Sequence, residues 1–474
     1  MSKKTKFSIT IKPYWLNDRV EYLDISGVLS EVCIKEGETI LYINEKTVNI
    51  PFCTFIKDLT IKDSKGSVPV QTISDKNPQA YIDTKLWIAE RTTAGEISFD
   101  YRIKPREVPN NYRSSPYFDF RSEKGGANGA GLTFLAVPKI EHEFKFELEW
   151  DLSQMPKDSV GVWSLGKNCV HKMCQSQTVL FSYYCVGLVQ SVEKDDFGIY
   201  WLSEMPYDPY SLANWTKELF FYMSEFFQDK ESIYRIFVRK DPFEQSGGGT
   251  ALARSFMFGY SDATENKIES VQSLLAHEMA HNWPNIPDQP VGYSTWYNEG
   301  TAEYYSVVLP YRAGLISLDD VLKNIEAKTA KYYKNPKRNM TNQELAEQYW
   351  SDRRTQVIPY GKGFVYLANV DAKIRSVTKD EKSLDDVVMA LIKKTRKGLK
   401  LTVDDWLEEI KNYIGEDATK DFKNMTEGQL IVPDNRAFGG AFIVTPVKIE
   451  LEDTCEEVLG FQWKINDNIV EPKI

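Results

Sequence analysis

Two of the four histidines in this 474-residue chain stand four residues apart, in the stretch LLAHEMAHNWP, and a glutamate directly follows the first. Residues four apart lie on one face of a helix, so His277 and His281 can direct ring nitrogens at a single point. This spacing predicts a site for one zinc ion. Glu278 lies about 100° round the helix from His277, a position that favours contact with a metal-bound water and predicts a general base.

A catalytic zinc ion usually has three protein ligands and a water, so a third ligand is needed. The other histidines, His142 and His171, fall in a different part of the chain, and position 287, where some zinc peptidases have a third histidine, is a proline. We therefore expect a carboxylate. The stretch STWYNEGTAEYY offers Glu299 and Glu303 on one helix face; we choose Glu299 as the ligand, with Glu303 either supporting a ligand or replacing Glu299.

Gly300 directly follows the chosen ligand. Glycine weakens a helix, but the lack of a side chain lets two helices approach closely. We expect this glycine to bring the Glu299 helix close enough to the histidine helix for the two to share one ion.

Two other groups of polar residues have simpler interpretations. Cys169, His171 and Cys174 occur together in CVHKMC, but without a second ligand pair they are more typical of small buried side chains in a strand than of a second metal site. Arg353 and Arg354 could receive a substrate carboxylate, although paired arginines on a surface are more often solvated.

Three motifs, HEMAH, WYNEGTAEYY and IPYGKGFVYLANVDAKIR, resemble those of the gluzincin aminopeptidases, zinc enzymes that include leukotriene hydrolase and the glycyl aminopeptidases. The tryptophan of HNW and the run LPYRAGLISLDD resemble the glycyl aminopeptidase branch. The resemblance implies that His277, His281 and Glu299 bind zinc, that Glu278 is the base, and that Tyr360 stabilises the oxyanion of the transition state.

The sequence departs from this family in two places. The gap between His281 and Glu299 holds 17 residues, one fewer than is usual in the main aminopeptidase family. The glycine-rich segment that precedes the zinc helix reads EQSGGGTALARS and has no acidic residue after Gly249, where relatives carry a glutamate that holds the free amine of the substrate. We expect Gly247, Gly248 and Gly249 to pair with the substrate backbone as an added strand does, and the need for a free N-terminus stays open.

Hydrophobic periodicity predicts the elements that position these residues. Alternation of period two, as in FKFELEW, predicts an antiparallel β domain over residues 1–203, with EKGGANGAG as a turn-rich connection. Helical periodicity then predicts a thermolysin-like, mostly helical α+β catalytic domain over 204–430, in which SIYRIFVRK and GGGTALARSFMFGY are strands. Renewed alternation over 431–474 predicts a segment too short to be a domain, whose strands pack on one of these domains.

Two of the expected helices begin with a recognisable cap. Ser383 precedes Asp386 by three residues, and Thr402 precedes Asp405 by three. This spacing resembles a capping box with aspartate in place of glutamate. A third helix is expected over GFVYLANVDAKIR, which begins three residues after Tyr360.

Composition narrows the function classes. A formal net charge of −10 argues against binding to nucleic acid or anionic lipid. The N-terminal stretch lacks the apolar run of a signal peptide, and 18 consecutive apolar residues occur nowhere. Six cysteines in so long a chain favour reduced thiols and a cytoplasmic location.

The sequence therefore predicts a zinc-dependent metallopeptidase of the aminopeptidase type, acting near the N-termini of peptides. The alternative is a zinc hydrolase that acts on a small molecule, an epoxide or ester, on the same scaffold. A non-catalytic protein is disfavoured, because the predicted base and all three ligands are present.

Overall fold

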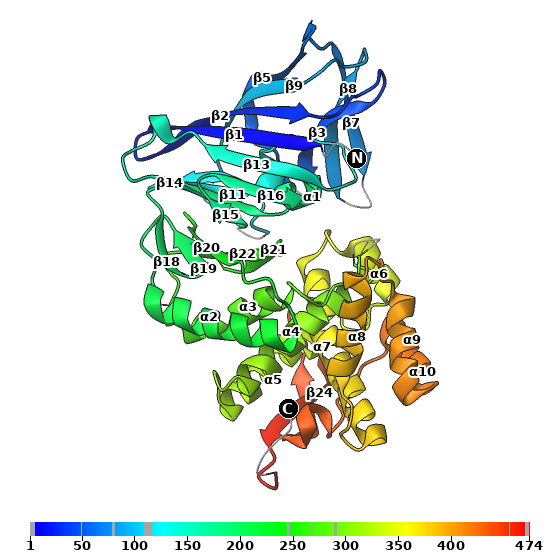
Figure 1. The fold of residues 1–474 in the computed structure, drawn as a ribbon. Coiled ribbons are helices and arrows are strands. Elements are labelled where there is room, and N and C mark those ends of the chain that lie inside the picture. The colour runs from blue at the N-terminus through cyan, green and yellow to red at the C-terminus, as the bar shows by residue number, and fades with distance from the viewer. Residues whose placement is uncertain are drawn as a thin grey trace. The chain divides into compact units, whose positions relative to one another are not determined.

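The computed structural model describes residues 5–48, 50–77, 81–108, 116–243, 247–265, 267–288, 292–454, 456–469 and 474. The chain forms two compact units (Figure 1). The first comprises Met1–Asn214 and Ser232–Ile268, and the second comprises Trp215–Glu231 and Glu269–Ile474. The first compact unit thus includes residues 204–214 and 232–268, beyond the predicted domain limit at residue 203. The predicted domain limits at residues 203 and 430 remain predictions.

The first unit is built mainly of β-sheet, as predicted. Its largest sheet has seven strands in the order β16-β13-β1-β2-β9-β5-β6. Their bounds are β1 (Lys6–Leu16), β2 (Arg19–Ser30), β5 (Thr54–Asp63), β6 (Gly66–Ser67), β9 (Ile97–Lys104), β13 (Phe144–Trp150) and β16 (Val170–Cys174). Most neighbours are antiparallel, but β1 and β13 are parallel. On β13 the apolar residues of FKFELEW are buried, which places this face on the core.

A second sheet has the order β10-β11-β17-β14-β15, and a third joins β12, β3, β8 and β7, with β4 paired to β3. Their bounds are β3 (Thr39–Thr47), β4 (Ile50–Pro51), β7 (Val70–Asn77), β8 (Ile82–Ala89), β10 (Arg121–Glu123), β11 (Gly126–Ala130), β12 (Val137–Pro138), β14 (Val160–Trp163), β15 (Gly166–Lys167) and β17 (Tyr183–Gly187). Three short helices connect these strands: η1 (Gly131–Thr133), η2 (Leu152–Gln154) and α1 (Ser176–Leu180).

The stretch EKGGANGAG was predicted as a turn-rich connection, but its turn is limited to Lys124 and Gly125. Gly126–Ala130 forms the fully buried strand β11, paired with β17. A Cβ atom at Gly126 would lie 2.1 Å from the carbonyl oxygen of Val186, and one at Gly129 would lie 2.3 Å from that of Asp119. The glycines are there because neighbouring backbone approaches closely, which is the other common reason for glycine within a strand.

The fourth sheet of the first unit contains both strands predicted from SIYRIFVRK and GGGTALARSFMFGY. Its order is β18-β19-β20-β22-β21; β19, β20 and β22 run parallel to one another, and the two outer strands β18 and β21 are antiparallel to them. The bounds are β18 (Gln190–Lys194), β19 (Phe197–Trp201), β20 (Tyr234–Lys240), β21 (Gly249–Leu252) and β22 (Ser255–Tyr260). The glycine-rich strand β21 pairs only with β22 and is the edge of this sheet.

The second unit is mostly helical, as predicted (Figure 1). Its helices are α2 (Pro209–Phe226, whose first turn belongs to the first unit), α3 (Glu269–Ala280), α4 (Thr295–Arg312), α5 (Leu318–Tyr333), α6 (Asn342–Gln348), α7 (Arg353–Thr378), α8 (Leu384–Arg396), α9 (Val403–Ile414), α10 (Asp417–Thr426) and η3 (Ala437–Gly440). Helix α7 contacts α4, α5, α8 and α9 and forms the centre of the core. No described helix is long and apolar enough to cross a membrane.

Both predicted capping boxes are present. The Ser383 and Thr402 hydroxyls accept from backbone N–H groups of the first turn, while the carboxylates of Asp386 and Asp405 accept from the N-cap residues. The start of α7 was predicted ten residues late. Asp352 caps its N-terminus by accepting from the Arg354 N–H, so the helix continues through a proline and includes the YGKG motif.

The C-terminal strands were expected to pack on one of the two domains. In the structure, β23 (Phe442–Glu450) and β24 (Glu457–Ile465) pair with each other as a two-stranded sheet. Two strands alone are marginally stable in water, and aromatic packing against the helices compensates: the Trp463 ring lies 5.8 Å from that of Phe438, and Phe461 lies 5.0 Å from Tyr333.

Candidate metal centre

Helices α3 and α4 bring the three predicted zinc ligands together. His277 is in the last turn of α3, His281 follows the end of that helix, and Glu299 is in the first turns of α4. The Nε2 atoms of the histidines lie 3.1 Å apart, and the Glu299 Oε2 atom lies 3.2 Å from that of His277 and 3.3 Å from that of His281. Among the described residues, this is the group whose ligand atoms converge on one point.

The triangle of donor atoms fits a tetrahedral ion. Ligands at 2.0–2.1 Å from a tetrahedral centre are separated from one another by roughly 3.3 Å, because of the tetrahedral angle. All three edges of the observed triangle, from 3.1 to 3.3 Å, agree with this separation. Two imidazoles and one carboxylate are a donor set typical of catalytic zinc, with the fourth position left for water. These residues therefore fit a zinc ion.

A second layer of charge lies behind His277. The Glu303 Oε2 atom lies 3.7 Å from the His277 Nδ1 atom, so the carboxylate favours a proton on Nδ1 and leaves Nε2 free to bind metal. Glu303 in turn forms an ion pair with Lys328 of α5, and only 5% of Glu303 and 6% of Lys328 are exposed. The ammonium group compensates the buried charge of Glu303, and this keeps the carboxylate ionised beside the histidine.

The pKa values show how strongly these groups depend on one another. Burial lowers the pKa of His277, but the carboxylates of Glu303 and Glu299 outweigh burial and raise that pKa to about 10. For Glu299, burial raises the pKa, while His281 and His277 outweigh it and lower the pKa to about 2. The site thus concentrates negative charge around the ring nitrogens, which favours either a proton or a divalent cation.

Tyr360 of α7 lies beside the ligands. Its ring stacks on that of His277, with centroids 5.6 Å apart and an interplanar angle of 13°. Burial, followed by the charge of Glu299, raises the pKa of the Tyr360 hydroxyl well above its ordinary value. The hydroxyl is therefore protonated at neutral pH and is able to donate a hydrogen bond.

The glycine next to Glu299 has a different role from the one expected. A Cβ atom on Gly300 would lie 2.7 Å from the backbone of Gly363, and one on Gly363 would lie 2.0 Å from the Trp296 carbonyl oxygen. The close helix approach is thus between α4 and α7, not between α4 and α3. It brings the helix of Tyr360 next to the helix of Glu299.

Glu278, the predicted base, is 7% exposed near the end of α3. The chain beyond His281 is held in place by α4, because the Asn298 side chain accepts from the Ile286 N–H and donates to the Ile286 carbonyl, both at 2.8 Å. The Trp283 indole donates to Asp229 at 2.8 Å. These contacts stabilise the segment between the two ligand helices.

Other candidate residues belong to other elements of the chain. Gly249 begins the edge strand β21 in the first unit, Gly247 and Gly248 directly precede it, and their pairing with substrate remains a prediction. Arg354 forms an ion pair with the cap residue Asp352, 3.0 Å away, which agrees with a surface role.

The CVHKMC stretch forms no metal cluster among the described residues. Cys174 is buried, and burial raises its thiol pKa to about 12, whereas Cys169 and His171 are exposed. Cys455 lies outside the described residues.

The one residue of the centre that the sequence did not indicate is Lys328. It lies 25 residues after its partner Glu303, on a different helix, and no motif marks it. Its apolar neighbours Ile325 and Tyr332 on α5 are buried, so a lysine on the buried face of an amphipathic helix was the only available signal.

Comparison with known proteins supports the interpretation of His277, His281 and Glu299 as a zinc site. Residues 270–365, which include all the metal-centre residues described above, match the model of the M61 glycyl aminopeptidase family. A comparison with curated protein sequences found no match.

Solved structures share the fold over most of the chain. An aminopeptidase N family protein from Idiomarina loihiensis aligns with a TM-score of 0.70 at 13% identity, covering 93% of this chain and 79% of that one. An M1 zinc metallopeptidase from Deinococcus radiodurans aligns with a TM-score of 0.56 at 14% identity, covering 90% and 94%. Yeast LTA4 hydrolase aligns with a TM-score of 0.55 at 12% identity, covering 91% and 68%.

The fold, the converging His-His-Glu donors and the family match agree with one another. The chain has the fold of M1 zinc metallopeptidases, its residues 270–365 are similar to the M61 glycyl aminopeptidase family, and its His-His-Glu donors fit the zinc ion of such enzymes.

Proposed function

We propose that this protein hydrolyses peptide bonds close to the N-terminus of its substrates, with Glu278 as general base and Tyr360 as oxyanion donor. The observation that carries the proposal is the triangle of His277, His281 and Glu299 donor atoms, with Glu278 on the same helix and Tyr360 stacked on a ligand. When bound there, zinc supplies a water of pKa near 7 and polarises the scissile carbonyl.

The side chains have separate tasks in this reaction. Glu278 accepts a proton from the attacking water and then transfers it to the leaving amine, which needs a proton to depart. The Tyr360 hydroxyl, protonated because its pKa is raised, donates a hydrogen bond to the carbonyl oxygen as negative charge develops there. Glu303 acts only by orienting His277.

The position of β21 at the edge of a sheet favours a peptide as the substrate. Among the described residues, β21 pairs with β22 alone, so an extended chain could add to its other side. An extended peptide gains main-chain hydrogen bonds at such an edge.

The missing glutamate after Gly249 favours a second candidate. A site that does not hold a free amine through that residue can accept an N-blocked peptide, or a small epoxide or ester, as on the fold of LTA4 hydrolase. The chemistry at the metal would be the same, and only the substrate would differ.

The test uses the purified full chain with its bound metal. Fluorogenic amino-acid amides and short peptides, each with a free and an acetylated N-terminus, are assayed together with an ester substrate. We expect turnover of peptides, loss of activity after treatment with a chelator, and recovery when zinc is restored. Turnover of the ester alone would support the second candidate, and zinc-independent activity would contradict both.

A further inference from the structure

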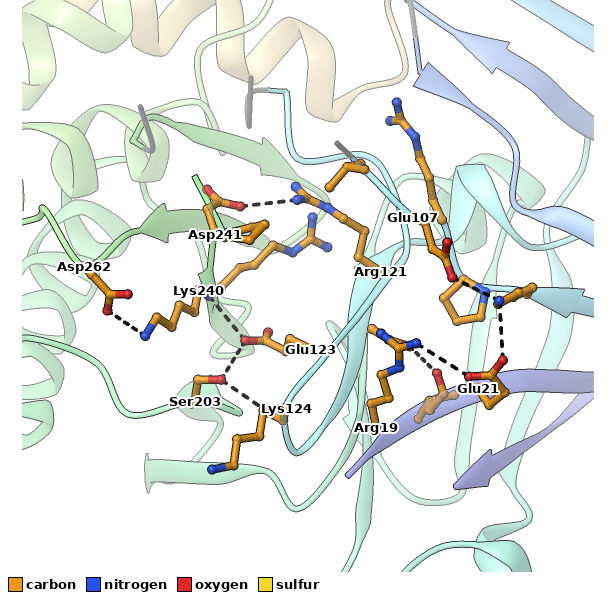
Figure 2. Close-up of a pocket in the computed structure, with 18 residues that line it drawn as sticks. Arg19, Glu21, Glu107, Arg121, Glu123, Lys124, Ser203, Lys240, Asp241 and Asp262 are labelled. Carbon is orange, nitrogen blue, oxygen red and sulfur yellow. Dashed lines mark hydrogen bonds and ion pairs between the residues drawn. The ribbon is translucent and has the colours of Figure 1, made fainter. Parts of the chain in front are cut away.

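The first unit contains a cavity of about 510 Å³ that is lined by charged side chains (Figure 2). Its walls come from the start of β2, the strand β10, the segment that follows β9, and the end of β20. This volume is within the range of small-molecule sites in proteins. The cavity is therefore large enough for an organic molecule and not only for a single ion.

One of the two buried arginines of this cavity is fully used by the fold. Arg239 is 1% exposed. Its Nε atom donates to Asn128 Oδ1 at 2.7 Å, its Nη1 atom donates to Asp119 Oδ1 at 2.9 Å, and its Nη2 atom donates to the carbonyl oxygens of both residues. Arg239 thus joins β20 to β11 and to Asp119, which precedes β10, and has little capacity left for a ligand.

Arg121, the other buried arginine, is only partly paired. It is 5% exposed, its Nε atom lies 3.0 Å from Asp119 Oδ2, and its Nη1 atom lies 3.4 Å from Asp241 Oδ1 (Figure 2). Its Nη2 atom is buried and has no hydrogen-bond partner among the described residues. A buried donor without an acceptor destabilises a fold, and a guanidinium edge is well suited to bind two oxygens of a carboxylate or phosphate.

The remaining charges of the cavity favour an anion. Seven basic side chains line it against five acidic ones; the basic ones besides the two buried arginines are Arg19, Lys104, Arg106, Lys124 and Lys240. Among the acids, the pKa of Glu123 is raised to about 7, chiefly by burial. Glu123 is therefore partly neutral near pH 7, which increases the excess of positive charge.

We propose that this cavity binds a small organic anion through a carboxylate or phosphate group, whose oxygens accept hydrogen bonds from the Arg121 guanidinium. An oxygen of the ligand accepts the hydrogen bond that the Arg121 Nη2 atom otherwise lacks. The other basic residues that line the cavity attract the anion. The proposal does not depend on the peptidase reaction, because all the lining residues belong to the first unit and none is a candidate for catalysis.

The test is isothermal titration calorimetry of the full-length, zinc-loaded protein at low ionic strength. The probes are inorganic phosphate and succinate, titrated separately. We expect saturable binding of at least one probe. Tighter binding of phosphate would identify a phosphorylated ligand, and tighter binding of succinate would identify a carboxylic acid. Absence of saturable binding of both probes overturns the proposal.

Variants assign the binding to this cavity. Arg121→Gln removes the charged fork, and we expect binding at least about tenfold weaker. Arg121→Lys keeps the charge but loses the two-oxygen geometry, and we expect a decrease of several-fold. Thermal melting shows whether each variant is folded, which matters because Arg121 is also paired with two aspartates.

A rim variant gives the test a second, independent arm. Lys124→Gln changes an exposed lysine that lines the cavity, and we expect binding two- to fivefold weaker from the loss of one nearby charge. Lys157→Gln is the matched control, since this lysine is exposed in the same unit but does not line the cavity. If all variants bind like the wild type, the anion binds elsewhere, for example at the metal, and the proposal is wrong.

Discussion

The metal centre and the anion cavity both bury several charged side chains, but they arrange them in opposite ways. At the metal centre, His277, His281 and Glu299 direct three donor atoms at one point, and the supporting pair of Glu303 and Lys328 lies behind them. In and beside the cavity, acidic and basic groups are joined to each other, and the Nη2 atom of Arg121 has no hydrogen-bond partner in the part of the chain that the structure describes.

The difference separates charges that act on a ligand from charges that hold the fold. Converging donors repel or compete with one another until a cation joins them, so their removal should affect function more than stability. Paired groups such as Asp119 and Arg239 satisfy each other inside the protein, so breaking a pair leaves an uncompensated buried charge. Variants in the two regions should therefore differ in what they impair.

The largest effect is expected at the predicted base. Glu278→Gln should lower kcat by about 100- to 10,000-fold, because a positioned proton acceptor contributes on this scale. Zinc content, measured by plasma emission spectrometry, and the melting temperature should stay close to wild type. Unchanged activity in a zinc-loaded variant would contradict the role of Glu278.

Asp119→Asn should act on stability instead. Asp119 is 1% exposed and forms ion pairs with Arg106, Arg121 and Arg239, so its neutralisation should cost about 3–5 kcal/mol of unfolding free energy, measured by urea denaturation. The matched control is Asp100→Asn, which breaks an exposed pair with Lys57 and should cost less than about 1 kcal/mol. Equal losses in the two variants would show that burial does not govern the network.

Tyr360→Phe removes only the hydroxyl that we assign to the oxyanion. Loss of one such donor should lower kcat by about 100- to 1,000-fold with little change in KM, measured by steady-state kinetics. Tyr366→Phe, six residues further along α7, controls for the loss of a buried hydroxyl, and should change kcat by less than about threefold. A similar effect of both changes would point to packing.

Glu303→Gln should weaken zinc binding by about 10- to 100-fold, because the group that orients His277 is lost. Competition with a fluorescent chelator measures this affinity. The same change leaves Lys328 buried without its partner, so the double variant Glu303→Gln/Lys328→Met should recover stability without recovering affinity. Recovery of zinc affinity in the double variant would contradict the orienting role.

The smallest effect concerns Glu123 and pH. Its pKa of about 7 in the folded protein is above its ordinary value of 4.5, so the folded state binds the proton more tightly. The resulting stability is fully present below pH 4.5 and is lost as pH rises through 7, by less than about 3 kcal/mol. Glu123→Gln should remove this pH dependence, which urea denaturation at pH 4.5, 6 and 8 would reveal. If the variant kept the same pH profile, the pH dependence of stability would belong to another titratable group.

Local patterns predicted much of the helical unit. Caps such as Ser383 with Asp386 lie within one turn, so their geometry follows from neighbouring residues. The error at GGANGAG has the opposite origin, since Gly126 is required by backbone 60 residues away at Val186. The start of α7 was predicted too late because the apolar stripe of GFVYLANVDAKIR does not mark the preceding turns, which begin at the cap residue Asp352.

The sequence by itself determined the donor types of the metal centre, because His277, Glu278 and His281 lie within five consecutive residues at the end of one helix. Only the tertiary structure decided that Glu299 completes the triangle and that Lys328 supports Glu303 from α5. It alone also revealed the anion cavity, whose residues come from distant segments of the chain. Spacing along a helix is a local property that can be read from sequence, whereas contacts between distant segments depend on how the whole chain packs.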